Sequence, residues 1–167
     1  MGDIFGQMVG DELFGGMNIA TIHTAQALRA GIEQKGKVFS AAHSQGTPTE
    51  RRALDLLTPA ERNSVHMYGA GSQWYINEKT SGLGSAYNTR NIEDPVPYLG
   101  MMAGLAGNML PWNWDRIMDM GRNWHVFDSP QNRTPEGVAG NRHDFPVYYK
   151  KSVYDWVDDL RKKGHLN

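Results

Sequence analysis

The chain has 167 residues and a net charge of −1 at pH 7, with 17 basic and 18 acidic side chains. This length suits one domain with its own core, and the balanced charge argues against electrostatically driven binding to nucleic acid. The absence of cysteine excludes disulfide bonds, thiolate metal sites and a cysteine nucleophile. The sequence contains no run of 18 apolar residues, so it predicts no membrane-spanning helix. Its first residues also lack the pattern of a signal peptide.

Glycine is concentrated in the first sixteen residues and in residues 69–107. We expect residues 1–17 to form an N-terminal segment ahead of one domain over residues 18–167. Apolar residues at helical spacing then predict a helix over residues 19–30. A short β-prone run predicts a buried strand over residues 38–41. A second helix is predicted over residues 49–57.

Three further strands are predicted over residues 64–68, 85–89 and 124–127, and a final helix over residues 146–163. This helix places its apolar side chains on one face, which holds Tyr149, Val153, Trp156, Val157 and Leu160. Short strands that alternate with helices indicate a parallel sheet covered on both sides. The predicted fold class is therefore α/β, a three-layer, mostly parallel sheet of about four strands with flanking helices.

A candidate nucleophile follows the first predicted strand. The run Ala42-His43-Ser44-Gln45-Gly46 has small residues two positions before and two positions after the serine. Such a pentapeptide between a strand and a helix is typical of a nucleophile elbow, in which a sharp turn exposes the hydroxyl. The plain alternative is a turn serine that caps the helix. We expect His43 to pack beside the turn and to take no part in catalysis.

A serine hydroxyl needs a base, and the base needs an orienting carboxylate. Asp94 follows the third predicted strand and His143 the fourth, so both belong to the edge of the sheet where Ser44 lies. The chain order serine, aspartate, histidine is the order of the α/β-hydrolases. Asp128 is the alternative acid and His125 the alternative base. In the alternative without catalysis, Asp94 is a turn residue and His143 is a surface histidine.

The sequence resembles the carboxyl-terminal part of a lipase-type α/β-hydrolase over residues 18–163. Residues 42–47 resemble the lipase elbow Gly-His-Ser-Gln-Gly, with Ala42 in place of the first glycine. Residues 91–97, Asn-Ile-Glu-Asp-Pro-Val-Pro, resemble the Asp-Pro-Val turn that holds the triad acid. Residues 143–148, His-Asp-Phe-Pro-Val-Tyr, resemble the His-x-Phe-x-x-Tyr segment that holds the triad histidine. The spacing is also similar to that of lipase-like toxin domains in bacterial secreted effectors.

The resemblance implies a reduced α/β-hydrolase fold and a serine hydrolase without a cofactor. Ser44, Asp94 and His143 would form the triad, and the Gln45 N–H would donate to the oxyanion. The substrate would be a carboxylic ester, and an acyl-enzyme would form. The toxin likeness implies secretion or delivery into a target cell, action at its membrane, and a cognate immunity protein as partner.

One departure from the hydrolase pattern concerns the strands before the elbow. Only residues 1–43 precede Ser44, whereas a full hydrolase has several strands there, and a loop among them gives the second oxyanion donor. Gly15, Gly16, a missing part of a longer parent chain or a partner would have to replace it. A second hypothesis follows, an impaired hydrolase-like module for binding or assembly. A third is a homodimer in which two sheet edges pair.

The stretch from Tyr98 to Trp114 is rich in methionine and tryptophan. It predicts either a helix that packs on the sheet or an apolar lid and acyl-chain groove, lined by Met101, Met102 and Trp112. The second interpretation favours lipid or phospholipid substrates. The six histidines show no His-x-x-x-His or Glu-x-x-His spacing, so no metal site is expected.

Overall fold

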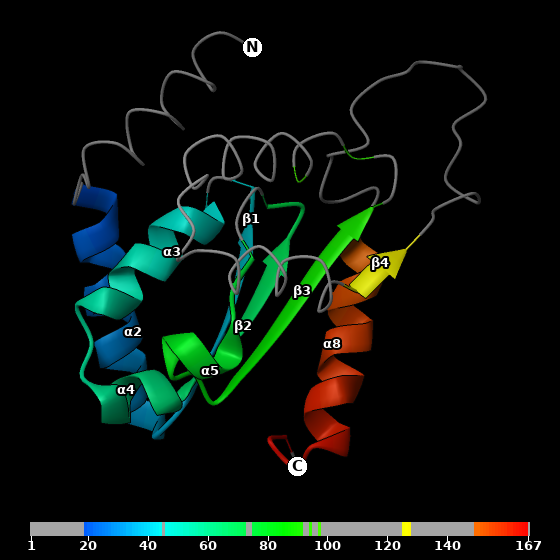
Figure 1. The fold of residues 1–167 in the computed structure, drawn as a ribbon. Coiled ribbons are helices and arrows are strands. Elements are labelled where there is room, and N and C mark those ends of the chain that lie inside the picture. The colour runs from blue at the N-terminus through cyan, green and yellow to red at the C-terminus, as the bar shows by residue number, and fades with distance from the viewer. Residues whose placement is uncertain are drawn as a thin grey trace, which may run out of the picture.

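The structure is a computed structural model. It describes residues 19–44, 46–72, 75–91, 94, 97 and 149–166, together with the backbone of residues 125–127. Nine helices and strands follow one another in this part of the chain (Figure 1).

A parallel sheet forms the middle of the described fold. Its strands lie in the order β1-β2-β3-β4, and every neighbouring pair is parallel. The bounds are β1 Val38–His43, β2 Val65–Ala70, β3 Ser85–Asn91 and the short β4 His125–Phe127. The strand arrows of Figure 1 all point to its upper side, so the carboxyl ends of the strands share one edge. The α/β class and the parallel sheet with flanking helices are therefore confirmed.

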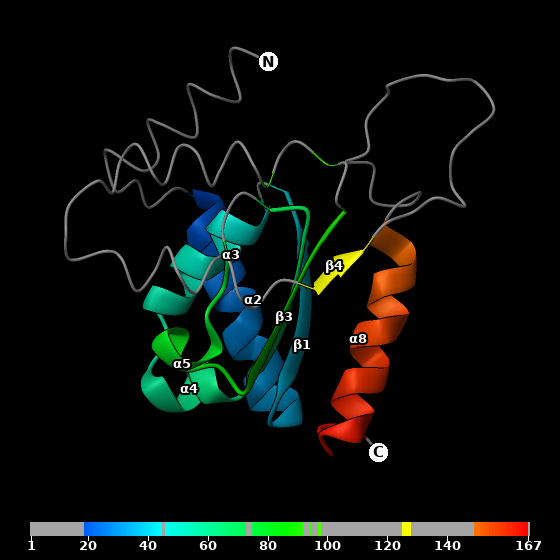
Figure 2. The same ribbon diagram turned by 45° about the vertical axis from the view of Figure 1, so that its right-hand side comes forward.

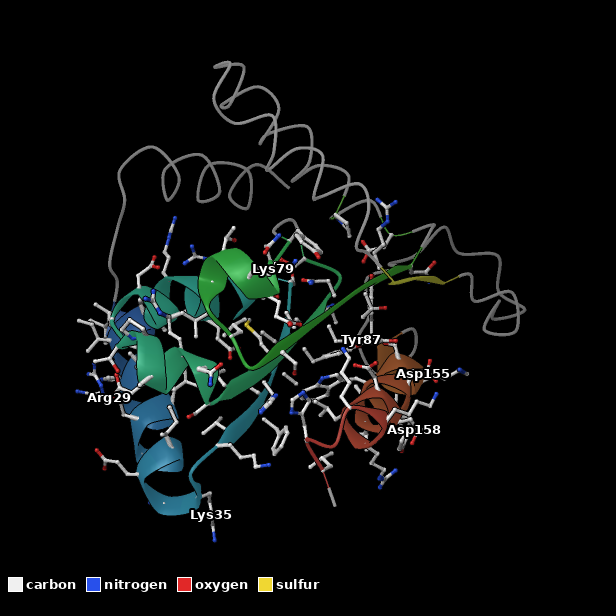
Figure 3. The ribbon with its side chains drawn as sticks, turned by 60° about the horizontal axis from the view of Figure 1, so that its bottom comes forward. Arg29, Lys35, Lys79, Tyr87, Asp155 and Asp158 are labelled. Carbon is white, nitrogen blue, oxygen red and sulfur yellow. The ribbon has the colours of Figure 1, made fainter. Side chains whose placement is uncertain are left out.

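Helices cover the sheet on both faces, as the edge-on view in Figure 2 shows. One face carries α2 (Ile19–Lys35), α3 (Gly46–Asp55), α4 (Pro59–Asn63) and α5 (Glu78–Ser81). The other face carries α8 (Lys150–Lys162). In Figure 3, Arg29 and Lys35 on α2 and Asp155 and Asp158 on α8 lie on opposite sides of the sheet, and Tyr87 of β3 points toward α8.

Alternation along β2 divides the interior into two cores, because successive side chains of a strand point to opposite faces. Val65 and Met67 belong to the core under α2 and α3. Tyr68 and Ala70 belong to the core under α8. All six residues of β2 are buried, which fits a strand with a neighbour on each side and helices above and below.

Helix α8 fits the sheet through positions four residues apart. Ser152, Trp156 and Leu160 are its buried residues, and this spacing places them on one stripe of a helix. The rings of Trp156 and Tyr68 lie 5.3 Å apart between centroids. The apolar face predicted for the last helix is thus present, with Ser152 added to it.

Most predicted elements exist, but their ends differ. Helix α3 starts at Gly46 instead of Thr49, because the turn at Ser44 feeds directly into it: the Thr47 N–H donates to the Ser44 carbonyl at 3.2 Å. Strand β2 continues to Ala70 instead of Tyr68, since Ala70 pairs with both neighbouring strands. Helices α4 and α5 were not predicted.

Candidate active site

Ser44 lies directly after β1 and two residues before α3. Its φ is +54°, and among the described residues it is the one non-glycine residue with a positive φ. This conformation is disfavoured for a residue with a Cβ and costs on the order of 1–3 kcal/mol. The turn is fixed on both sides, because the Ser44 N–H donates to the Ala70 carbonyl at 3.0 Å and its carbonyl accepts from Thr47. Ser44 is partly exposed.

The strand register brings Ser44 and Asp94 to the same edge of the sheet. His43 pairs with Ala70, and Ala70 pairs with Thr89, so β1, β2 and β3 reach this edge together. Ser44 follows β1, and Asp94 comes three residues after the end of β3. Because β2 lies between them, β1 and β3 are about 10 Å apart. An imidazole with a hydrogen bond at each end nearly spans such a distance.

Asp94 is fully buried. Its carboxylate oxygen Oδ2 accepts a hydrogen bond from the Tyr149 hydroxyl, and its backbone N–H donates to the Asn91 carbonyl at 3.1 Å. A buried carboxylate is tolerated where hydrogen bonds replace water. The bond from the Asp94 N–H to the Asn91 carbonyl three residues earlier is that of a turn, so Asp94 is a turn residue, and its buried, hydrogen-bonded carboxylate has an environment that suits a structural or a catalytic acid.

Gly71 makes the close approach at this edge possible. Its φ is +52°, and a Cβ added to it would lie 2.8 Å from the Tyr149 ring carbon Cζ and 2.9 Å from Asp94 Oδ2. Its N–H donates to the Thr89 carbonyl at 3.0 Å. Only glycine fits here, so the end of β2 lies against the Tyr149–Asp94 pair.

Tyr149 is a site residue that the sequence assigned only to an apolar helix face. It is fully buried, its hydroxyl accepts from the Asn91 N–H at 3.1 Å, and its ring lies 5.4 Å from the His43 ring between centroids. Burial, and then the Asp94 carboxylate, raise the pKa of Tyr149 above its usual value. His43 therefore packs beside the turn, as expected. The sequence signal that could have indicated this role is the hydroxyl of a tyrosine on a buried helix face, since a buried tyrosine hydroxyl needs a hydrogen-bond partner.

Glu50 lies behind the turn, on the buried face of α3. Burial raises its pKa to about 7, although a hydrogen bond with Ser40 of β1 opposes the shift. An acid with this pKa gains and loses its proton near neutral pH. Glu50 points to the β1 side of the helix, and we assign it no catalytic step.

Several predicted site residues lie outside the described part of the chain: Gln45, Met101, Met102, Trp112, Asp128 and His143, as do Gly15 and Gly16. Of His125, the backbone forms part of β4, paired with Thr89. The structure therefore places Ser44 and Asp94 at the same edge of the sheet, while the triad and its base stay predictions.

Neither a metal cluster nor a membrane span is found among the residues described. No group of three or more histidine, aspartate or glutamate side chains lies close enough there to hold a metal ion. No helix in that part of the chain is long and apolar enough to cross a bilayer.

The fold and this edge define an α/β protein in which a serine at a strained strand-to-helix turn and a buried aspartate share the carboxyl ends of a parallel sheet. Comparisons with protein-family models, curated proteins and solved structures gave no match.

Proposed function

We propose that this protein is a serine hydrolase that cleaves carboxylic esters of lipids or phospholipids, with Ser44 as the nucleophile. The observation that carries the proposal is the positive φ of Ser44 between β1 and α3. An ordinary helix-capping serine has an extended conformation with negative φ. A nucleophile elbow, in contrast, is built on a strained turn of this kind, and backbone strain gathers at functional sites.

In this mechanism the Ser44 Oγ attacks the acyl carbonyl carbon while His143 takes the hydroxyl proton. Asp94 holds the imidazole in the required tautomer and stabilises the imidazolium. The oxyanion accepts a hydrogen bond from the Gln45 N–H. The imidazolium then gives its proton to the leaving alcohol oxygen, and an acyl-enzyme remains. Water, deprotonated by His143, hydrolyses that ester and restores Ser44.

The position of Asp94 supports this assignment of roles. It is fully buried and accepts a hydrogen bond from Tyr149. It follows β3, and Ser44 follows β1, so one strand, β2, lies between the two. The order of the proposed triad residues along the chain is the hydrolase order. Seen this way, the domain is a reduced α/β-hydrolase fold.

The lipid part of the proposal rests on sequence composition. The stretch of residues 98–114 is rich in methionine and tryptophan, and such side chains suit adaptable apolar surfaces and membrane interfaces. Met101, Met102 and Trp112 would contact the acyl chain. From the toxin likeness we further propose a secreted or delivered protein that acts at a target membrane and is neutralised by an immunity protein.

A second candidate function is an impaired hydrolase-like module that binds or assembles. The observation that favours it is the place of β1, which within the described strands has a neighbour on one side only. A full oxyanion hole needs a second donor near Ser44, and losing one donor costs about 2.7–4 kcal/mol of transition-state stabilisation. A strand from a partner or a second copy on the open edge would then complete the site.

Hydrolysis of an ester series separates the two candidates. We expect turnover of p-nitrophenyl esters and of phospholipid vesicles, and a loss of at least about a thousandfold in Ser44→Ala. Ser64→Ala is the matched control, because Ser64 lies before β2, at the opposite edge of the sheet. Equal turnover in Ser44→Ala and wild type would contradict the proposed nucleophile, and no turnover by wild type would favour the impaired module.

A further inference from the structure

The contact between Tyr149 and Asp94 joins the start of α8 to the loop after β3. Both side chains are fully buried. The Tyr149 hydroxyl donates to Asp94 Oδ2 and accepts from the Asn91 N–H at 3.1 Å. Asn91 is the last residue of β3, and Asp94 lies three residues further. The phenol thus bridges the end of a strand and the side chain that follows it.

The direction of this hydrogen-bond chain is fixed by its ends. A backbone N–H can only donate, so the Tyr149 oxygen is the acceptor toward Asn91. The single hydroxyl proton is then given to the carboxylate. Burial and the neighbouring carboxylate raise the pKa of Tyr149, so the hydroxyl keeps its proton at all physiological pH values. Hydrogen bonds in such a chain polarise one another, and a carboxylate that receives one shares part of its charge with the donor.

Tyr149 is held from several directions. Its ring lies against the α-carbon of Gly71, where a Cβ would come within 2.8 Å of the ring, and faces His43 of β1. Its backbone carbonyl accepts from the Ser152 hydroxyl at 2.7 Å and from the Tyr68 hydroxyl at 3.4 Å. Ring and backbone are therefore both fixed, and the hydroxyl has little freedom to leave Asp94.

We propose that Tyr149 is a positioning residue of the proposed catalytic triad, which holds the acid, Asp94, by Oδ2 and so sets the orientation and the charge of its carboxylate. This inference rests on the proposed function. Tyr149 comes six residues after His143, the predicted base, in the sequence. Tyr149 touches neither substrate nor the reacting atoms, and it acts through Asp94.

The rate of reaction with a fluorophosphonate, followed by intact mass, tests the inference, since the probe reports the activated serine directly. We expect Tyr149→Phe to react about 10- to 100-fold more slowly than wild type at pH 7, the effect of one hydrogen bond to a charged group. Tyr87→Phe is the matched control. It removes the hydroxyl of another buried tyrosine on the α8 side of the sheet, whose ring stacks on that of Tyr68 at 6.1 Å between centroids, and we expect its rate within about twofold of wild type.

Two further readouts separate positioning from a structural role. In the Asp94→Asn background, Tyr149→Phe should slow the reaction no further, because both changes act on one chain of contacts. The acid limb of the pH–rate profile should move to higher pH in Tyr149→Phe, since a carboxylate that shares less charge stabilises the imidazolium more strongly. A site-specific 3-fluorotyrosine at position 149 keeps the shape and donates more strongly, so it should move the limb to lower pH. It also covers the case in which Tyr149→Phe does not fold.

The outcomes are distinguishable. Equal slowing by Tyr149→Phe and Tyr87→Phe, additive loss with Asp94→Asn, or an unmoved acid limb with 3-fluorotyrosine would overturn the positioning role while the hydrolase proposal stands. A wild-type protein that does not react, or a Ser44→Ala variant that reacts equally, would overturn the hydrolase proposal itself.

Discussion

Ser44 combines two properties that rarely meet in one residue. It has a side chain with a Cβ, and its backbone has the positive φ that favours glycine. Glycine at this position would relieve the turn but remove the hydroxyl. In the proposed hydrolase, the chemistry of the Ser44 Oγ gives a reason for a serine at this strained position.

The strained turn at Ser44 predicts an unusual order of stabilities for variants at this position. We expect the free energy of unfolding of Ser44→Gly to be about 1 kcal/mol higher than that of Ser44→Ala, because glycine adopts a positive φ without a clash. Urea denaturation of the two variants measures the difference. At Ser64, where φ is −88°, the order should reverse and alanine should be the more stable. A Ser44→Gly variant no more stable than Ser44→Ala would remove the argument from strain.

Gly71 allows a second comparison at the same scale. Gly71→Ala adds a methyl group within 3 Å of both Tyr149 and Asp94, whereas Gly36, with φ +75°, has no atom within 4 Å of the added Cβ. Both changes place alanine at a positive φ, which costs about 1 kcal/mol. We expect Gly71→Ala to lose a further 1–3 kcal/mol or so through overpacking. Equal losses, measured by thermal unfolding of both variants, would show that the edge adapts freely.

The sequence predicted part of this site and missed the rest for physical reasons. The pattern around Ser44 is local, so five residues were enough to predict the turn. Asp94 followed from its place after a strand. The role of Tyr149 depends on a contact between residues 55 positions apart in sequence, which no local pattern contains, and its helical spacing indicated only a core position.

At the scale of elements, the unpredicted helices had signals in their caps. Helix α4 begins with a capping box, in which Thr58 accepts from the Glu61 N–H and Glu61 accepts from the Thr58 N–H. Helix α5 is capped by Asn77 and ends at Gly82, with φ +69°. Both helices are too short for an apolar periodicity to emerge. Strand ends were less predictable, because pairing with neighbours lengthens β2 beyond its apolar run.

The contact between α3 and β1 predicts a pH dependence of stability. The folded protein keeps the Glu50 proton up to about pH 7, whereas the unfolded chain loses it near pH 4.5. The folded state thus binds more protons in this window, so the free energy of unfolding falls as pH rises through it. We expect Glu50→Gln to gain stability relative to wild type from pH 4.5 to 7, by an amount on the order of 2–3 kcal/mol.

His66 affects stability in the opposite direction over the same pH range, so the measurement must separate it from Glu50. Burial lowers the pKa of His66 to about 4, so its contribution to stability rises with pH between about 4 and 6.5 and masks Glu50 in the wild-type profile. The difference between Glu50→Gln and wild type cancels His66, which both proteins share. Glu33→Gln, at an exposed position of α2, is the control and should match wild type at each pH. A difference that does not grow with pH would contradict the buried-acid assignment.

In the molecule as a whole, the sheet separates two layers of helices, each with its own core. Helices α2 to α5 and their core cover one face, and α8 with the tyrosine-rich core covers the other (Figure 2). The carboxyl edge belongs to both, because Ser44 leads into α3 and Asp94 is held from α8 through Tyr149. Each layer thus holds one of the two proposed catalytic residues, and the contact between the His43 and Tyr149 rings joins the two sides.

We propose that the fold activates Ser44, and intact mass after incubation with a fluorophosphonate is the experiment to make first. We expect one adduct on the wild-type chain, none on Ser44→Ala, and an unchanged adduct on Ser64→Ala. Peptide mapping should place the adduct on Ser44. A folded wild-type chain that gains no adduct, or an adduct that persists in Ser44→Ala, would contradict the claim.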